Sequence, residues 1–143
     1  MSHETLQKFE EDKNTIKDFG YWKLLVSNNT RTLGNCVLVI KRDARRFSEL
    51  TPEEMENFAV AVKETEDALR LAFKYDKINW LMLMMHDLQV HFHVLPRYQE
   101  TKEFAGMSFE DGFKKGDPLI YDKLDLSQDM LDSIRDEIKS KMN

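Results

Sequence analysis

Gln89, His91 and His93 alternate with apolar residues in the segment 88–98, and imidazole is the side chain that most readily attacks, binds metals or moves protons near neutral pH. The alternation from residue 89 to residue 94 has the period of a half-buried strand, so the three polar side chains are predicted to share one face. Two imidazoles two residues apart on a strand lie about 6.5 to 7 Å apart along the chain. One bound group could therefore touch both rings.

Three kinds of chemistry remain open for this pair of histidines. A His-x-His pair can bind zinc, manganese or iron once a third ligand joins it, but the chain has only two other histidines, His3 near its start and His86 at a predicted turn. The two rings can also be ordinary hydrogen-bonding groups on a solvated face. Finally, a neutral imidazole can attack phosphorus while the second ring contacts the phosphoryl oxygens, and this reaction needs no metal.

The composition indicates a single soluble domain, residues 1–143. Hydrophobic residues make up 41% of the chain and charged residues 33%, and no apolar run is long enough to cross a membrane. The formal net charge of -5 argues against binding along a nucleic-acid backbone, which requires a basic surface. Because Cys36 is the only cysteine and cannot form an internal disulfide, we predict a reducing, cytoplasmic location.

Hydrophobic spacing predicts a helix and then two strands in the first forty residues. Apolar residues at helical spacing predict an amphipathic N-terminal helix within residues 1–20, with Gly20 as its stop. Residues 21–26 and 36–40 have the aromatic and aliphatic composition of strands, and turn-prone residues separate them. We therefore expect an antiparallel pair, with Cys36 in the core.

A long helix and a hairpin are predicted next. Thr51, with proline after it and Glu54 three positions on, is typical of a capping box, and the apolar stripe behind it predicts a helix that ends near residue 75 and covers one face of a sheet. The apolar run 78–85 predicts a strand. His86 and Asp87 then leave room only for a tight turn before the motif strand, predicted over residues 89–96 with Pro96 at its end.

The remaining part of the chain, residues 99–143, is predicted to contain a long loop and a C-terminal helix capped by Ser127. Aromatic residues in the loop either cover a pocket or a partner, or pin the loop to the body of the protein. These aromatic residues are Phe104, Phe109, Phe113 and Tyr121.

Two other segments allow a plain and a chemical interpretation. Residues 41–46 are basic, and they form either a solvated loop, which we favour, or a rim that faces a phosphate. Met82, Met84 and Met85 are expected to be adaptable core filler rather than contacts to a cofactor.

The motif strand and its surroundings resemble the histidine triad (HIT) superfamily, whose signature is His-φ-His-φ-His-φ-φ with φ apolar. Residues 89–97 read Gln-Val-His-Phe-His-Val-Leu-Pro-Arg, and the Pro-Arg ending is common in the hydrolase branch of that family. The order of predicted elements in residues 21–98 is similar as well. The resemblance implies an α+β fold with an antiparallel β-sheet of about five strands, a long central helix and N- and C-terminal helices, usually as a homodimer.

The resemblance also implies a nucleotide hydrolase or nucleotidyl transferase that uses no cofactor or metal. Such an enzyme cleaves a nucleoside phosphate, polyphosphate or phosphoramidate through a nucleotidyl-histidine intermediate. His91 corresponds to the nucleophile, His93 to the histidine that contacts the phosphate and supplies a proton, and Gln89 would orient the phosphate or His91. The alternative is a nucleotide-binding or interaction module that has the fold and little activity. The further candidates for nucleotide or phosphate contacts are Asn28, His86 and Arg97.

Two departures from the family pattern bear on activity. Gln89 stands where the family has its first histidine, and an amide can hydrogen-bond but cannot titrate. The predicted tight turn is shorter than the loop of many members, so part of the phosphate cradle is expected to be missing, and each lost donor costs about 2.7 to 4 kcal/mol in well-studied cases. The catalytic interpretation also requires His91 to face an open, anion-accepting cleft with His93 beside it.

Overall fold

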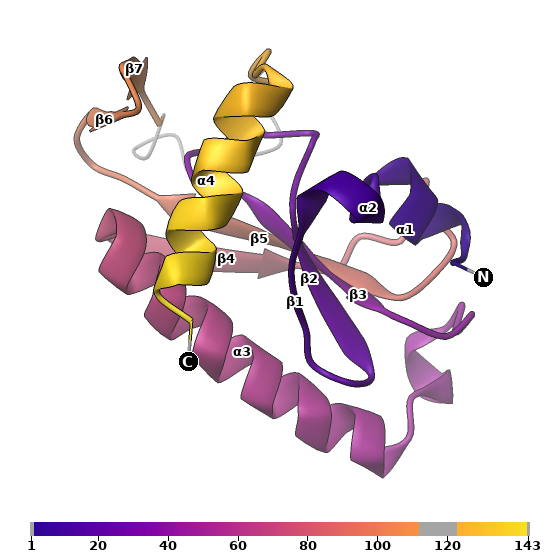
Figure 1. Ribbon diagram of the computed structural model, residues 1–143. Helices are drawn as coiled ribbons and strands as arrows, with labels where there is room; N and C mark the ends of the chain where they lie inside the picture. Colours follow the sequence, from indigo (N-terminus) through magenta and orange to yellow (C-terminus); the bar gives the residue numbers. More distant parts are fainter. Residues whose placement is uncertain (1, 112–122, 143) are drawn as a thin grey trace.

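A computed structural model describes residues 2–111 and 123–142 (Figure 1). The strands are β1 (Thr15–Asp18), β2 (Trp22–Val26), β3 (Cys36–Ile40), β4 (Lys77–Leu81), β5 (His91–Arg97), β6 (Lys102–Phe104) and β7 (Met107–Phe109). The helices are α1 (Glu4–Lys8), α2 (Glu11–Asn14), the short 3-10 helix η1 (Phe47–Glu49), α3 (Pro52–Phe73) and α4 (Gln128–Ser140). Five strands form one antiparallel sheet in the order β1-β2-β3-β5-β4, which confirms the predicted α+β class.

The long helix α3 begins at the predicted capping box. The hydroxyl of Thr51 accepts a hydrogen bond from the amide of Glu54 at 3.1 Å, and the Glu54 carboxylate accepts one from the Thr51 amide at 2.9 Å. The helix ends where Lys74 takes a left-handed conformation with φ of 52°. In Figure 1, α3 runs diagonally past the sheet, and the C-terminal end of α4 reaches α3.

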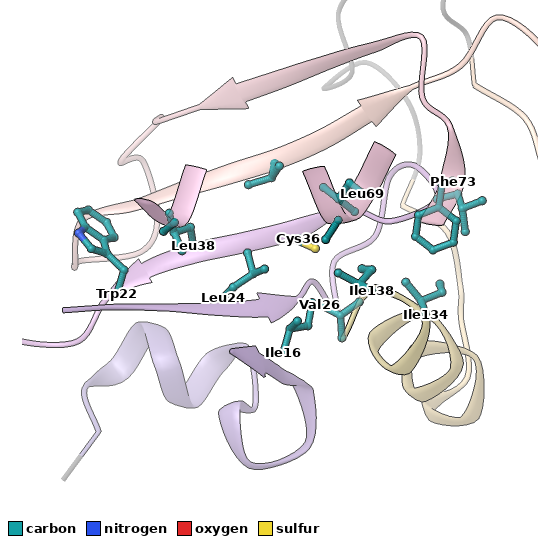
Figure 2. Close-up of a cluster of buried hydrophobic side chains, with 14 of the residues drawn as sticks. Ile16, Trp22, Leu24, Val26, Cys36, Leu38, Leu69, Phe73, Ile134 and Ile138 are labelled. Carbon is teal, nitrogen blue, oxygen red and sulfur yellow. The ribbon is translucent and has the colours of Figure 1, made fainter. Parts of the chain in front are cut away.

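The main core lies between the sheet and these two helices. Figure 2 shows Leu24 and Leu38, from the central strands, on the same side of the sheet as Leu69 of α3 and Ile138 of α4, all four of which belong to one buried cluster. Every residue of β3 is buried. Cys36 is fully buried, as predicted, and burial strongly raises the pKa of its thiol.

The opposite face of the sheet carries the histidines. Val39 lies opposite His91 and Val37 lies opposite His93 in the register of β3 with β5, and directly opposed residues share a face. A second, smaller buried cluster lies on this face and joins the sheet to the N-terminal segment. Its members are Leu6, Phe9, Leu25, Val37 and Val39.

The predicted N-terminal helix is wrong in its extent. Glu10 takes a left-handed conformation with φ of 55°, which ends α1 and starts the single turn of α2, and β1 follows and pairs with β2. The apolar residues that suggested one helix serve two different cores. Leu6 and Phe9 cover the histidine face, whereas Ile16 belongs to the main core. Helical spacing in the sequence therefore concealed a chain that crosses from one face of the sheet to the other.

The predicted tight turn between β4 and the motif strand is also wrong. β4 ends at Leu81, and residues 82–90 form an irregular connection before β5 begins at His91. The motif strand therefore spans His91–Arg97 rather than residues 89–96, and Pro96 lies within it. Val90 bonds to the end of β3 and to the loop after it, since its carbonyl accepts from the amide of Ile40 at 3.1 Å and its amide donates to the carbonyl of Ala44 at 2.9 Å. Met85 is 78% exposed rather than core filler, while Met82 and Met84 pack against the core as predicted.

Residues 99–111 contain a small hairpin, β6 and β7, where the sequence predicted an irregular loop. Phe104 packs edge-on against Phe73 with ring centroids 5.4 Å apart, and Phe109 is 3% exposed, so these two aromatics pin the segment to the core. Phe113 and Tyr121 lie outside the described residues. Ser127 caps α4 as predicted, because its hydroxyl accepts a hydrogen bond from the amide of Met130.

The basic segment 41–46 is a solvated loop. Each of its cations pairs with a carboxylate of the same surface, and none of them lines the cavity described below. The pairs are Lys41 with Asp18, Arg42 with Glu54, Arg45 with Asp43 and Arg46 with Glu49. Among the described residues, no helix is both long and apolar enough to span a bilayer.

Candidate functional site

His91 and His93 lie side by side on the sheet, as the alternation predicts. Their ring centroids are 4.9 Å apart and their planes are nearly perpendicular, at 86°. His93 is paired with β3 on one side and with β4 on the other, and His91 is paired with β3, so the sheet holds the backbone of both residues. Phe9, from the junction of α1 and α2, packs against His93 with centroids 6.3 Å apart. The two rings therefore sit on a rigid strand beneath the N-terminal segment.

One ring nitrogen of His91 is bound by the main chain. Nδ1 lies 2.7 Å from the carbonyl oxygen of Gln89. A carbonyl can only accept, so this contact assigns the proton of the neutral ring to Nδ1 and leaves the lone pair on Nε2. The arrangement gives His91 an unprotonated nitrogen on the far side of the ring, which nucleophilic attack and metal binding both require.

The expectation that His91 faces an open cleft is wrong. The His91 side chain is only 2% exposed, and its Nε2 lies 3.6 Å from Oδ2 of Asp87. The other oxygen of Asp87 accepts a hydrogen bond from the ammonium group of Lys8, at 2.5 Å. The carboxylate is 9% exposed and is held between a histidine of the sheet and a lysine of α1. This position follows from the irregular connection 82–90, which the sequence did not indicate.

A cavity of about 340 Å³ adjoins these residues. His93 and Asp87 form part of its wall, and Lys8, Arg31 and His86 contribute groups that can carry positive charge. Asn29, Asn35, Phe9 and Leu95 are among its other lining residues. The volume is in the range of small-molecule sites, and the mixture of apolar and cationic walls suits an organic anion.

Burial sets the protonation of His93. Loss of hydration, followed by the nearby His91, lowers the pKa of His93 to about 4. His93 is therefore uncharged at neutral pH. It can donate a hydrogen bond from its ring N–H to a bound oxyanion, but at neutral pH it holds no second proton to transfer.

The side chain of Gln89 faces away from the cavity. Its oxygen accepts hydrogen bonds from the amide (3.1 Å) and the hydroxyl (2.6 Å) of Thr5, and its amide nitrogen donates to Glu4 and to Asp43, each at 2.7 Å. These bonds fasten α1 to the sheet. Only the backbone carbonyl of Gln89 contacts His91, so its amide group does not orient that ring.

The three further predicted contacts have different surroundings. His86 lies in the irregular connection 82–90 and lines the cavity. Asn28 instead donates to the carbonyl of Lys8 at 3.1 Å on the surface, and the residue after it reaches the cavity. Arg97 is 4% exposed and forms an ion pair with Asp111, with Nε 2.9 Å from Oδ2. Neither Asn28 nor Arg97 lines the cavity.

Sequence reasoning missed most of the cavity wall. Lys8 belongs to the stretch for which the spacing predicts an amphipathic helix, and Arg31 and Asn35 belong to a loop for which the sequence predicts only turns. Asn35 is 2% exposed, donates to the carbonyl of Val94 at 3.0 Å and accepts from the amide of Arg31 at 2.9 Å. A buried asparagine that joins a loop to the motif strand has no local sequence signal, because its partners are distant in the chain.

Similarity to known proteins agrees with this fold. The HIT domain family matches residues 8–100. An uncharacterized HIT-like protein from Methanocaldococcus jannaschii is 35% identical over an alignment of 79 residues, which covers 52% of this chain and 61% of that protein. This chain thus spans less than two thirds of the relative's length.

Solved structures show the same architecture along nearly the whole chain. A histidine triad protein from Sinorhizobium meliloti aligns with a TM-score of 0.71 and 20% identity, covering 99% of this chain and 96% of its own. A histidine triad protein from Bradyrhizobium japonicum aligns with a TM-score of 0.71 and 19% identity, covering 99% and 97%. Together with the family match over residues 8–100 and the paired histidines on β5, these similarities show that the chain belongs to the HIT domain family.

Proposed function

We propose that the protein is a nucleotide hydrolase or nucleotidyl transferase in which His91 is the nucleophile. The observation that carries this proposal is the 2.7 Å contact between Nδ1 of His91 and the carbonyl of Gln89, which leaves the lone pair on Nε2. That nitrogen faces the carboxylate of Asp87, which lines the cavity together with His93. Family membership supports the same chemistry, since nucleotidyl transfer to a histidine is what the resemblance implies.

The reaction has two steps at phosphorus. Nε2 attacks the phosphoryl group next to the nucleoside, the N–P bond forms, and the bond to the leaving group breaks as that group departs with its electron pair. Water, or another acceptor, then attacks phosphorus, breaks the N–P bond and restores the imidazole. The carbonyl of Gln89 accepts from Nδ1 throughout, so it stabilises the positive charge that develops on the ring of His91 during attack.

The cavity wall supports an anionic substrate with an apolar part. Lys8 and Arg31 supply positive charge for the phosphates, and the ring N–H of His93 can donate to a phosphoryl oxygen. Phe9 and Leu95 contribute apolar groups to the cavity wall. Attack requires the carboxylate of Asp87 to move away from Nε2, and a bound phosphate can replace it as the partner of Lys8.

A second candidate function is nucleotide binding without efficient turnover. It is favoured by the position of Asp87, whose negative charge stands 3.6 Å from the nucleophilic nitrogen. It is also favoured by Gln89, whose side chain is fully engaged with α1 and Asp43 and offers nothing to a substrate. In this case the cavity binds a nucleotide, and the histidines serve only as hydrogen-bonding groups.

Covalent trapping distinguishes the two functions. The chelator-treated protein is incubated with adenosine and guanosine substrates of three kinds, namely dinucleoside polyphosphates, nucleoside phosphoramidates and nucleoside diphosphates, and then quenched. We expect an acid-labile nucleotidyl adduct on His91, loss of turnover in His91→Ala, and partial recovery of His91→Gly by free imidazole. Imidazole should give no gain in the control His86→Gly. Thermal stabilisation by nucleotides without product or adduct would favour the binding module instead.

A further inference from the structure

We propose that His91, His93 and Asp87 form a binding site for a divalent transition-metal ion of the zinc class. Each residue offers one lone-pair atom, and the three atoms all lie within 4.8 Å of one another. They come from one rigid strand and from the connection that precedes it. Two imidazoles and one carboxylate are a donor set that suits zinc and its neighbours in the first transition row.

The distances are close to those of a zinc site. Ligand atoms around a tetrahedral zinc ion lie about 3.3 to 3.6 Å apart, given zinc-ligand bonds of about 2.0 to 2.2 Å. Nε2 of His91 and Oδ2 of Asp87 are already 3.6 Å apart. The rings of His91 and His93 are nearly perpendicular, with centroids 4.9 Å apart, so they do not stack on each other. Because the three ligand atoms lie within 4.8 Å of one another, small rotations of the ring side chains and of Asp87, which belongs to an irregular segment, bring them to the spacing of a zinc site.

Two of the three ligands already have the outer hydrogen bonds that metal ligands need. A histidine that binds a metal usually donates its other ring N–H to a carbonyl or carboxylate, and Nδ1 of His91 does so to Gln89. The second oxygen of Asp87 is held by Lys8, which leaves Oδ2 directed at His91. These bonds fix the tautomer of the ring and the direction of the carboxylate before any ion arrives.

The site would be open on one side. His93 and Asp87 both line the cavity of about 340 Å³, so a fourth coordination position could be filled by water or by an anion from that cavity. An ion bound there takes the lone pair of Nε2. Metal binding and nucleophilic attack by His91 therefore exclude each other, a consequence that rests on the proposed function, whereas the metal site itself does not.

Calorimetric titration of the full chain with zinc chloride alone, after chelator treatment and dialysis, tests the site. We expect one zinc ion per chain, a rise in melting temperature with zinc, and at least a hundredfold weaker binding in Asp87→Asn and His93→Phe. This loss should exceed the 10- to 100-fold effect of removing an outer partner. The amide oxygen of Asp87→Asn can still accept from Lys8, so that variant should fold. Asp67→Asn, an exposed aspartate on α3, is the matched control and should bind zinc as the unaltered chain does.

Cobalt provides a second measurement on the same variants. Cobalt(II) in the site should give the visible absorption of a four- or five-coordinate ion, and both ligand substitutions should remove it. The proposal is overturned if the unaltered chain binds less than one equivalent of zinc, or if Asp87→Asn binds zinc within twofold of the control, since the ion then lies elsewhere. Zinc binding is measured without nucleotide and nucleotide turnover with chelator, so each proposal can fail without the other.

Discussion

Nε2 of His91 faces the carboxylate of Asp87 at 3.6 Å, so the nitrogen best placed for attack is directed at a negative charge. Lys8 holds the other carboxylate oxygen and balances that charge from α1. The site accordingly joins three segments, namely the motif strand, the connection before it and the N-terminal helix. Any anion that reaches His91 must compete with Asp87.

Removal of the negative charge of Asp87 should strengthen anion binding in the cavity. We expect Asp87→Asn to bind adenosine monophosphate about tenfold more tightly than the unaltered chain, because a unit charge near the phosphate site costs on the order of 1 kcal/mol even when it is partly screened. Calorimetry with chelator present measures the change, and raised salt should reduce it. Asp67→Asn serves as the control. Weaker binding in Asp87→Asn would mean that the carboxylate helps to position the nucleotide.

Restoration of the missing first histidine should destabilise the protein. The amide of Gln89 makes four hydrogen bonds with Thr5, Glu4 and Asp43, whereas an imidazole offers only two ring nitrogens. We expect Gln89→His to lose about 1 to 3 kcal/mol of unfolding free energy, because buried groups lose their partners. Urea denaturation measures the loss, and hydrogen exchange at the Thr5 amide should accelerate. Gln7→Ala, an exposed change on α1, should be nearly neutral.

Stability should fall in mildly acidic solution because of His93. Its pKa is about 4 in the folded protein, against 6.5 as its ordinary value, so between these pH values the unfolded chain binds more protons. The contribution of the neutral His93 ring to the unfolding free energy is complete above pH 6.5. It is lost as the pH falls toward 4, and the loss is about 3 kcal/mol at most. Urea denaturation across this range, with chelator present, should show a shallower decline for His93→Asn. Parallel curves would mean that the ring is solvated.

Arg97 should matter for stability rather than for substrate. The guanidinium pairs with Asp111 in surroundings where the two side chains are 4% and 2% exposed. Loss of one partner leaves the other charge buried, so we expect Arg97→Met to cost about 3 to 5 kcal/mol of unfolding free energy. Lys63→Met breaks an exposed pair with Asp67 on α3 and should cost less than about 1 kcal/mol.

Nucleotide affinity, measured under conditions where Arg97→Met is folded, should equal that of the unaltered chain. If Arg97→Met instead lost nucleotide affinity with little change in stability, Arg97 would be a phosphate contact after all.

The sequence by itself determined the elements with strong local patterns. The capping box at Thr51 and the buried run of β3 predicted the long helix and a central strand. Alternation of residues placed His91 and His93 on one face, and the motif identified the family. These features follow from chemistry between neighbours in the chain, such as a cap bonded three residues away or side chains that alternate along a strand.

Only the tertiary structure decided what those histidines face. The bond between Thr5 and Gln89 spans 84 positions, and the bond between Lys8 and Asp87 spans 79. No local pattern specifies such pairs, because packing of the N-terminal segment over the sheet brings them together. The same packing divided the predicted helix between two cores and turned Gln89 away from the cavity. The sequence thus identified the histidines, and the fold placed a carboxylate in front of them.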